Sequence, residues 1–497
     1  MNIAFIGNQG GDAVLGFYAG MAVAVRDKCG AARCIFLPWL NEERASLSTT
    51  GFSDHDILTF EDWVARRLPF AEEVARLRRD YNHVNWSAVV ASERAFTDYS
   101  LLLGSAGHRA ESSEYIQRLL VNIVTFLEFV FNGQNVQAVV CQTADTLFSH
   151  VVFKVAKHLG IKVFAVTPAL LLEEGAQGGH FTSNEWLESN KMLAHYKDMS
   201  GYTLSEGEVA RVNSFVAAVK GFKNKTSFVE ENRERKAGLT ALSPNVYRLL
   251  PYLRKNSRRD SDVEYIKVSP LLKVQANLIR LVRKFFNRNM FGRTDTSEVP
   301  AQSVFFAFQY QPEQSTLSQG LWYVNQIALA ENISKSLPLG YTLILKEHPW
   351  GRGARPTWQY RHLSGLYNIR FCDAPSKDII AKVAAVICIS GTVGFESMVL
   401  DKPTIILGRS FYTYCDLLYR LNSIQELPGV LRRILINGEY AEIPDRPERL
   451  NRFLLSYLKA LIPYFPTLAN ASHYGEALIA ELVKNESPAG KNVILER

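Results

Sequence analysis

Three short apolar runs between residues 343 and 408 constrain the fold of this chain more than any other feature. They cover residues 343–345, 385–389 and 404–407, are rich in Val, Ile and Leu, and end at proline, glycine or small polar residues. Continuous apolar runs of this length are typical of parallel strands that are buried on both faces. Ligands bind at the carboxyl ends of such strands. The sequence therefore predicts an α/β domain with a site on the loops after these strands.

The second run leads directly into a turn that suits phosphate. Ser390, Gly391 and Thr392 follow the strand, and residues 392–400 have helical length and spacing. A turn that opens a helix offers backbone N–H groups and the positive end of the helix dipole. Ser390, Gly391 and Thr392 are therefore candidates for binding a phosphate group.

The N-terminal half predicts a second domain of the same class. A strand over residues 2–6, a glycine-rich turn over 7–12, a helix over about 13–26 and a strand over 34–37 begin a doubly wound α/β domain. The glycines lack the spacing of a dinucleotide fingerprint, and no acidic residue closes the second strand. We expect no nicotinamide or other cofactor beyond the substrate.

A further β-α-β unit in this half covers residues 138–166 and places Asp145 on a loop after a strand, where ligands bind. Dense polar residues also occur within the mostly helical stretch 60–127, although a charged helical surface is the commoner meaning of such a run. Four further residues are candidates for the acceptor side of a site: Asn8, Gln9, Glu93 and His108.

The length of 497 residues is too great for one ordinary core and predicts several domains. We expect an N-terminal acceptor-side domain, a basic helical linker or insertion, a C-terminal donor-binding domain, and a final helix and tail that cross back. Their expected ranges are 1–190, 191–300, 301–465 and 466–497.

The positive charge of the chain is concentrated in one segment. Residues 248–293 hold twelve Lys or Arg against three Asp or Glu, and 271–286 interleave apolar residues with bases at helical spacing. Two alternatives stand about equal: peripheral contact with an anionic membrane, and a solvated linker helix. Nucleic-acid binding is disfavoured because no recognition motif accompanies the charge.

The expected location is the cytoplasm. The chain starts directly with a strand rather than a signal peptide, and we expect no run long enough to span a bilayer. Six scattered cysteines lack zinc-ligand spacing, which predicts free thiols in a reducing compartment and no metal site. If the basic segment binds lipid, the protein lies at the inner face of the bacterial cytoplasmic membrane.

Three motifs taken together resemble a known family. They run from Gln309 to Glu313, from Lys346 to Pro349 and from Ser390 to Glu396, with Lys402-Pro403 and Gly408 following. In this order and spacing they resemble the bacterial capsule polysaccharide biosynthesis proteins, which include the capsule and lipopolysaccharide Kdo transferases. The resemblance covers roughly residues 300–415. It implies a GT-B-like α/β fold, with two Rossmann-like doubly wound domains facing across a cleft, and a glycosyltransferase. We expect the enzyme to work without a metal, because no Asp-x-Asp lies in a suitable place.

The resemblance also implies roles for individual residues. His348 and the turn of Ser390, Gly391 and Thr392 would hold the donor phosphate and nucleotide. Lys346 would add charge, and Glu396 would bind the ribose. Some of these residues also have a structural alternative. His348 could cap the turn before Pro349, and Lys346 could simply lie next to His348 on the strand. Glu396 could stabilise its own helix by interacting with the helix dipole.

The resemblance places an acidic residue near the reacting sugar carbon, as nucleophile or electrostatic stabiliser, and Glu313 occupies that position. The Kdo-transferring members tend to carry Asp there, so this chain departs from their pattern. The expected catalytic residues are Glu313, His348 and Asp145. The alternative for Glu313 is a cap on the helix after Pro312.

These features predict a glycosyltransferase of capsule, O-antigen or other surface polysaccharide biosynthesis. It would transfer a sugar from a nucleotide-activated donor, with CMP-Kdo as first choice, to a glycan or lipid-linked acceptor. The alternatives are a polyol-phosphate transferase, a nucleotide-sugar epimerase, and a non-catalytic assembly protein that binds sugar nucleotides.

Overall fold

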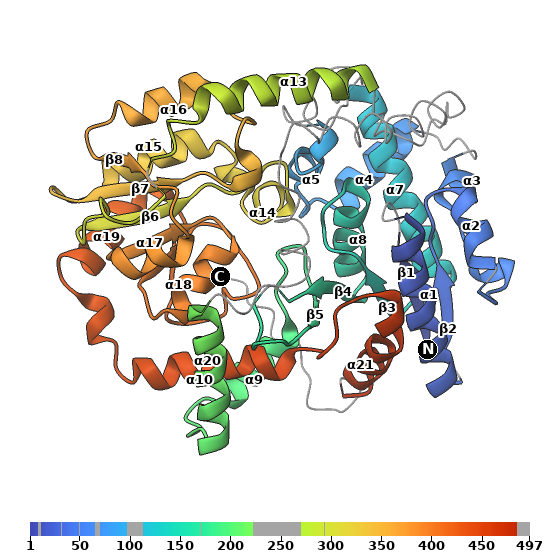
Figure 1. Cartoon of the computed structure of the whole chain (residues 1–497). Coiled ribbons are helices and arrows are strands. Elements are labelled where there is room, and N and C mark those ends of the chain that lie inside the picture. The colour runs from blue at the N-terminus through green and yellow to red at the C-terminus, as the bar shows by residue number, and fades with distance from the viewer. Residues whose placement is uncertain are drawn as a thin grey trace.

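Two β-sheets with helices on both faces organise the molecule (Figure 1). The computed structural model describes residues 1–7, 11–30, 32–48, 50–64, 70–96, 113–169, 171–221, 270–292 and 294–484. The first sheet has the strand order β2-β1-β3-β4-β5, and the second has the order β11-β10-β9-β6-β7-β8. The predicted α/β class with two Rossmann-like domains is confirmed.

The first sheet is parallel except for its last strand, since β5 runs antiparallel to β4. Its strands are β1 (Asn2–Ile6), β2 (Arg33–Phe36), β3 (Ala138–Cys141), β4 (Lys162–Pro168) and β5 (Gly179–Thr182). The helices of this half are α1 (Gly11–Lys28), α2 (Asn41–Ser48), α3 (Phe60–Val64), α4 (Phe70–Asp80), α5 (Trp86–Ala91), α7 (Ser113–Gly133) and α8 (Leu147–His158).

The second sheet is parallel throughout. Its strands are β6 (Ser303–Ala307), β7 (Thr342–Lys346), β8 (Ile369–Phe371), β9 (Ala385–Cys388), β10 (Thr404–Ile406) and β11 (Tyr419–Arg420). The remaining helices are α9 (Asn190–Asp198), α10 (Glu206–Lys220), α13 (Pro270–Asn287), α14 (Gln314–Leu317), α15 (Gln326–Ser336), α16 (Thr357–Ser364), α17 (Ser376–Lys382), α18 (Thr392–Val399), α19 (Leu427–Leu435), α20 (Arg446–Ala460) and α21 (Ala471–Lys484).

Burial on both sheet faces explains the continuous apolar runs. On β1, Ala4 and Ile6 face the core that α7 and α8 complete, whereas Ile3 and Phe5 face the core that α1 and α21 complete. Because successive strand side chains point to opposite faces, a strand covered on both sides needs apolar residues at every position. This requirement is why the sequence pattern located these strands well.

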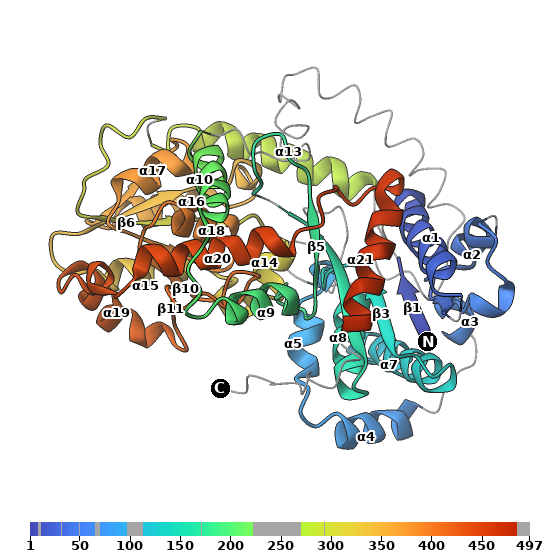
Figure 2. The ribbon, with the colours of Figure 1, turned by 90° about the horizontal axis from the view of Figure 1, so that it is seen from below.

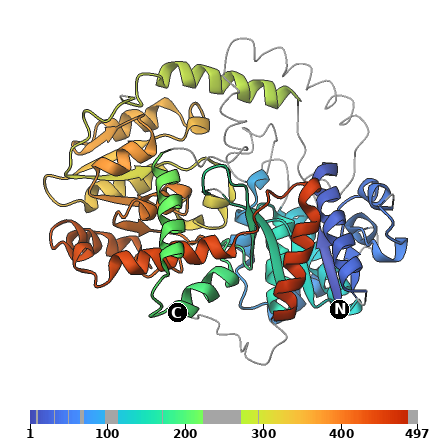
Figure 3. The same ribbon diagram turned by 60° about the horizontal axis from the view of Figure 1, so that its bottom comes forward.

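Helix α21 and the segment that leads to it pack on the first domain (Figures 2 and 3). After α20, the Ile462 N–H donates to the Gly179 carbonyl at 2.8 Å, and the Gly179 N–H donates back at 3.1 Å. Helix α21 then lies along α1, where a Cβ added to Gly475 would be 2.7 Å from the Ala24 Cβ. The two helices approach closely because glycine leaves room for the neighbouring backbone.

Helices α9 and α10 pack on the second domain, although they fall in the range expected to form a basic linker. Met192 of α9 and Phe215 of α10 share one buried cluster with Phe395, Phe453 and Tyr457. This cluster covers the side of the second sheet that carries α18 and α20.

Helix α7 corrects the expectation that no segment has the length to span a bilayer. Among the described residues it is the one helix that is long and apolar enough by length and composition. Ten of its residues, from Leu119 to Phe131, are nevertheless buried, and most of them lie in the first domain's core. In this structure α7 is a core helix.

Candidate active site

A cavity of about 1220 Å³ lies between the two domains and is lined from both. From the first domain, Thr143 and Asp145 follow β3, and Thr167 and Pro168 end β4. From the second domain come residues at or after the ends of β6, β7, β8 and β9, namely Gln309, Glu313, Lys346, His348, Asp373 and Ser390. The carboxyl ends of both sheets thus meet at one site, as open α/β sheets favour.

Arg94 of the first domain acts electrostatically on both carboxyl groups proposed for catalysis, Asp145 and Glu313. Nη2 of Arg94, in the short helix η2 (Arg94–Phe96), donates to the Asp145 carbonyl at 2.8 Å and lies 3.5 Å from Oδ2 of Asp145. Burial raises the pKa of Glu313 to about 7, and the positive charge of Arg94 opposes this rise. Burial also raises the pKa of Asp145, again against Arg94. A carboxyl group from each domain therefore lies within the field of one guanidinium.

Glu313 does not cap the helix that follows it. It occupies the position before α14, but its side chain makes no capping hydrogen bond, while its carbonyl accepts from the N–H groups of Thr316 and Leu317. The carboxyl group lines the cavity instead. A glutamate whose pKa is about 7 can exchange a proton with a substrate near neutral pH.

His348 combines the two roles that the sequence left open. Its Nδ1 accepts a hydrogen bond from the Trp350 N–H at 3.2 Å, which caps the short helix η6 (Pro349–Gly351), and the residue also lines the cavity. Burial lowers the pKa of His348, with Arg355 and Lys346 acting in the same direction and Glu347 opposing. The neutral ring that accepts at Nδ1 carries its proton on Nε2, where it can donate to a ligand.

A buried ion pair beneath His348 was missed by the sequence analysis. Nη1 of Arg355 donates to Oε2 of Glu347 at 2.6 Å, and the Tyr360 hydroxyl donates to the same oxygen at 2.6 Å. Oε1 of Glu347 accepts from the His348 N–H at 2.8 Å. The Arg355 and Glu347 side chains are 5% and 0% exposed. This network holds the backbone at His348. The sequence could not reveal it, because it depends on contacts that form only in the folded protein.

The turn after β9 is held by hydrogen bonds to the Gln309 side chain and the Ser315 carbonyl of the same domain. With its amide oxygen facing the turn, Gln309 accepts from the Ser390 N–H at 3.1 Å and from the Gly391 N–H. The Ser390 hydroxyl donates to the Ser315 carbonyl at 2.7 Å. Two of the N–H groups expected to bind phosphate are thus satisfied within the protein, and Thr392 and Val393 at the start of α18 line the cavity beside them.

Lys346 and Glu396 line the same wall of the cavity. The Lys346 ammonium donates to the Ala374 carbonyl at 2.6 Å. Burial lowers its pKa, whereas the carboxylates of Asp373 and Glu396 raise it. Asp373 in turn pairs with Arg352. The structure therefore brings together all the donor-side candidates, and it adds Arg352 and Asp373, which the sequence did not indicate.

His180 is a further cavity residue that the sequence did not indicate. It lies on β5, is 2% exposed, and neither ring nitrogen has a hydrogen-bond partner. Burial lowers its pKa to about 3, so the imidazole is neutral at physiological pH. A buried polar ring without a partner is costly, which favours a ligand contact at this position.

The acceptor-side expectations need one correction. Glu93 is fully buried and does not line the cavity; its Oε2 accepts from the Leu147 N–H at 2.6 Å at the start of α8. The Glu93 carboxylate therefore accepts a hydrogen bond from a backbone N–H at the N-terminus of α8 and does not face a sugar acceptor. Asn8, Gln9 and His108 lie outside the described residues.

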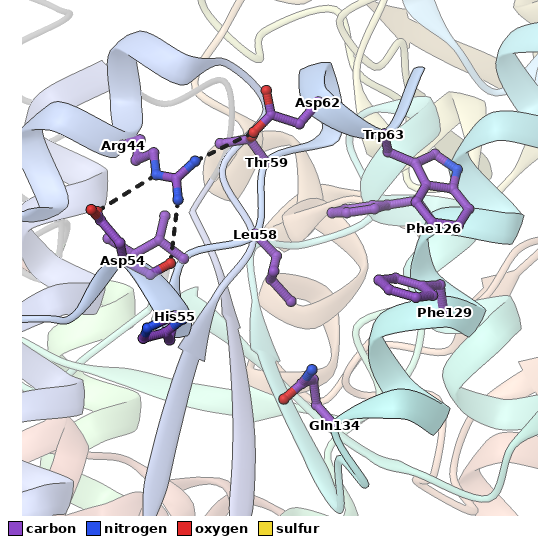
Figure 4. A pocket seen from close by; sticks show the side chains of 11 residues that line it. Arg44, Asp54, His55, Leu58, Thr59, Asp62, Trp63, Phe126, Phe129 and Gln134 are labelled. Atoms are coloured by element: carbon purple, nitrogen blue, oxygen red, sulfur yellow. Dashed lines mark hydrogen bonds and ion pairs between the residues drawn. The ribbon is translucent and has the colours of Figure 1, made fainter. Parts of the chain in front are cut away.

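A second, smaller cavity of about 320 Å³ lies in the first domain, away from the interdomain cavity (Figure 4). Its charged groups pair with one another, because Arg44 contacts Asp54 at 3.7 Å and Asp62 at 3.3 Å. Trp63 and Phe129 form its apolar side, with ring centroids 4.8 Å apart. Across the part of the chain that the structure describes, no three His, Cys, Asp or Glu side chains are grouped as metal ligands.

The two mainly parallel sheets and the cavity between their carboxyl ends define a GT-B-like fold of two Rossmann-like domains. Residues 273–425 match the family described as capsule polysaccharide biosynthesis protein, which confirms the predicted resemblance for this part of the chain. The matched range contains α13, Glu313, His348 and the turn before α18. No curated protein matches the chain.

The solved structures that match this fold have low sequence identity to the chain. The Neisseria meningitidis UDP-GlcNAc 2-epimerase bound to UDP-GlcNAc is 12% identical, with 98% of this chain and 100% of that chain covered and a TM-score of 0.24. The Thermosulfurimonas dismutans KpsC β-Kdo 2,7 transferase is 10% identical, with 72% and 89% covered and a TM-score of 0.33. At these values neither similarity carries an argument about the activity of this chain.

Proposed function

We propose that the protein is a glycosyltransferase of surface polysaccharide biosynthesis that uses a nucleotide-activated sugar as donor. The carrying observation is Glu313, a carboxyl group with a pKa of about 7 in a cavity between two domains that the neutral His348 also lines. The match of residues 273–425 to the capsule biosynthesis family supports the same assignment. The acceptor is a glycan or a lipid-linked glycan.

In this proposal the acceptor hydroxyl attacks the anomeric carbon of the donor. The new carbon–oxygen bond forms as the bond from that carbon to the phosphate oxygen breaks, and the nucleotide leaves with the electron pair. Glu313 takes the proton of the hydroxyl, a role that suits a carboxylate with a pKa close to the working pH. The rate depends on how well the leaving phosphate is stabilised.

The leaving phosphate would be held by the second domain. Nε2–H of His348 supplies one hydrogen-bond donor, and the start of α18 supplies the positive end of a helix dipole. Arg352 adds positive charge on the same wall, and Glu396 would bind the ribose of the nucleotide. Asp145 and Arg94 would face the acceptor from the first domain, because both line the cavity there.

CMP-Kdo remains our first choice of donor. The cavity's cations are Arg94, Lys346, Arg352 and Lys377, and its carboxylates are Asp145, Glu313, Glu347, Asp373 and Glu396. Because these charges are nearly balanced, charge alone does not select an acidic sugar. The choice rests on the motif resemblance and needs a direct comparison of donors.

The deciding experiment measures release of free nucleotide from CMP-, UDP-, GDP- and dTDP-sugars in the presence of bacterial glycolipid acceptors. We expect release from one donor, dependent on acceptor and unchanged by a metal chelator. Glu313→Gln should lower turnover by about 10² to 10⁴, whereas Glu442→Gln, an exposed glutamate, should not change it. No release from any donor, or full activity in Glu313→Gln, would refute the proposal. A changed sugar without acceptor would indicate an epimerase.

A further inference from the structure

Helix α13 packs on the protein with its polar side. Nη2 of Arg280 donates to the Trp350 carbonyl at 2.9 Å, and Nη1 of Arg283 donates to the Ala354 carbonyl at 2.7 Å. Asn287 is fully buried, and its Nδ2 donates to the Arg355 carbonyl at 3.4 Å. Figures 1 and 3 show α13 along the edge of the molecule, with no described element outside it.

The apolar side of α13 faces outward. Seven large apolar residues of this helix are 42% to 82% exposed: Leu271, Val274, Leu278, Leu281, Val282, Phe285 and Phe286. At 3.6 residues per turn these positions share an arc of roughly 140°, opposite the side that holds Arg280 and Asn287. A helix on the surface of a globular protein normally turns its apolar side to the core and its polar side to the solvent. Continuous exposed apolar surface of this kind marks an interaction site.

The charge around this arc favours one partner. Lys284 and Arg288 are exposed and lie beside the apolar arc, and the Arg288 guanidinium lies 4.6 Å from the Phe285 ring centroid. Residues 270–293 contain no Asp or Glu. An apolar face flanked by bases and free of acids is complementary to an anionic lipid surface. An apolar protein partner would not require this bias.

The helix is also attached directly to the candidate active site. A Cβ added to Gly353 would be 2.4 Å from the Arg280 carbonyl oxygen, so the loop after His348 lies in close contact with the helix backbone. His348, Trp350 and Arg352 of this loop line the interdomain cavity. A surface bound by α13 would therefore lie next to the donor side of the cavity.

We propose that α13 docks the protein on an anionic lipid bilayer. The apolar arc enters the boundary between headgroups and acyl chains, while Lys284 and Arg288 contact anionic headgroups. This inference goes beyond the proposed function, because it concerns a lipid surface rather than the donor or the transfer step. Its test needs no substrate, so its failure is independent of the glycosyltransferase assignment.

The test is sedimentation of the full chain with vesicles of phosphatidylcholine alone and of equimolar phosphatidylcholine and phosphatidylglycerol. We expect binding to the anionic vesicles and weak binding to the neutral ones. The triple variant Leu278→Gln, Leu281→Gln and Phe285→Gln should lower the partition coefficient at least about tenfold. Lys284→Gln with Arg288→Gln should lower it by roughly fivefold for each base, on anionic vesicles only.

The matched control replaces three exposed apolar residues elsewhere, Leu339, Ile436 and Val483, by Gln, and it should bind as the unchanged protein does. Thermal unfolding of all variants checks that they fold. Absence of vesicle binding by the unchanged protein would overturn the proposal. In that case a loss of dimer by the α13 triple variant in analytical ultracentrifugation would indicate that a second copy of the chain covers the face.

Discussion

At the scale of single residues, the candidate site depends on groups whose protonation is set by burial. Glu313 has a pKa near 7, and His348 and His180 are neutral near physiological pH, since burial lowers the pKa of both rings. A neutral imidazole can donate a hydrogen bond, and a half-protonated carboxyl group can give up or take up a proton near neutral pH. Proton transfer near neutral pH is therefore available in this site.

Arg94 gives this assignment a pH test. Because the carboxylate is the active form in the proposed mechanism, kcat/KM should rise with pH and level off above about 7. The charge of Arg94 lowers the pKa of Glu313, so Arg94→Gln should move the midpoint to higher pH. Arg79→Gln, at an exposed arginine, should leave it in place. A midpoint near the ordinary glutamate value, or a downward shift in Arg94→Gln, would contradict the assignment.

Residues on strand ends could be predicted, whereas their tertiary partners could not. Asp145, Glu313 and His348 follow apolar runs, and the parallel arrangement of those runs brings them to one cavity. Arg94 and His180 carry no local signal, because β5 is a short edge strand without apolar alternation and η2 follows no strand. Glu93 was wrongly placed, since a polar run in sequence does not reveal a carboxylate that binds the start of α8.

At the scale of elements, the η6 loop between β7 and α16 is constrained by a buried ion pair. Glu347 and Arg355 lie at its two ends, and both side chains are buried. A Cβ added to Gly351 would be 2.4 Å from Oε1 of Glu347, so the loop closes tightly over the ion pair. The loop also touches α13, which joins the proposed lipid-binding face to His348.

Removal of one partner of this ion pair should be costly. Arg355→Leu leaves the Glu347 carboxylate buried with only Tyr360 and the His348 N–H as donors, and should lower the free energy of unfolding by about 3–5 kcal/mol. Urea denaturation measures the change. Arg361→Leu, at an exposed arginine of α16, serves as control. The double variant with Glu347→Leu should recover part of the loss, and a loss below about 1 kcal/mol would show that the pair is not a structural constraint.

At the scale of the whole molecule, the described residues cross between the domains twice. The first follows β5, where Glu188 accepts from Arg409 at 2.8 Å and 3.0 Å. The second follows α20 and leads to α21, which completes the core of the first domain with Tyr474 and Leu478. The core of the N-terminal domain therefore includes residues of α21, a long-range relation that no local pattern specifies.

Gly475 tests this dependence. Gly475→Leu places side-chain atoms where the Ala24 Cβ and the Met21 carbonyl oxygen lie, at 2.7 Å and 2.8 Å from the added Cβ, so it should separate α21 from α1. We expect the free energy of unfolding to fall by about 1–3 kcal/mol. Hydrogen exchange should show faster exchange in α1 and β1, because they share the core with α21. Gly429→Leu is the matched control in α19, since nothing lies within 4 Å of its added Cβ, and it should be neutral or stabilising. Equal stability of the two variants, with protection of α1 unchanged, would show that the first domain's core does not depend on α21.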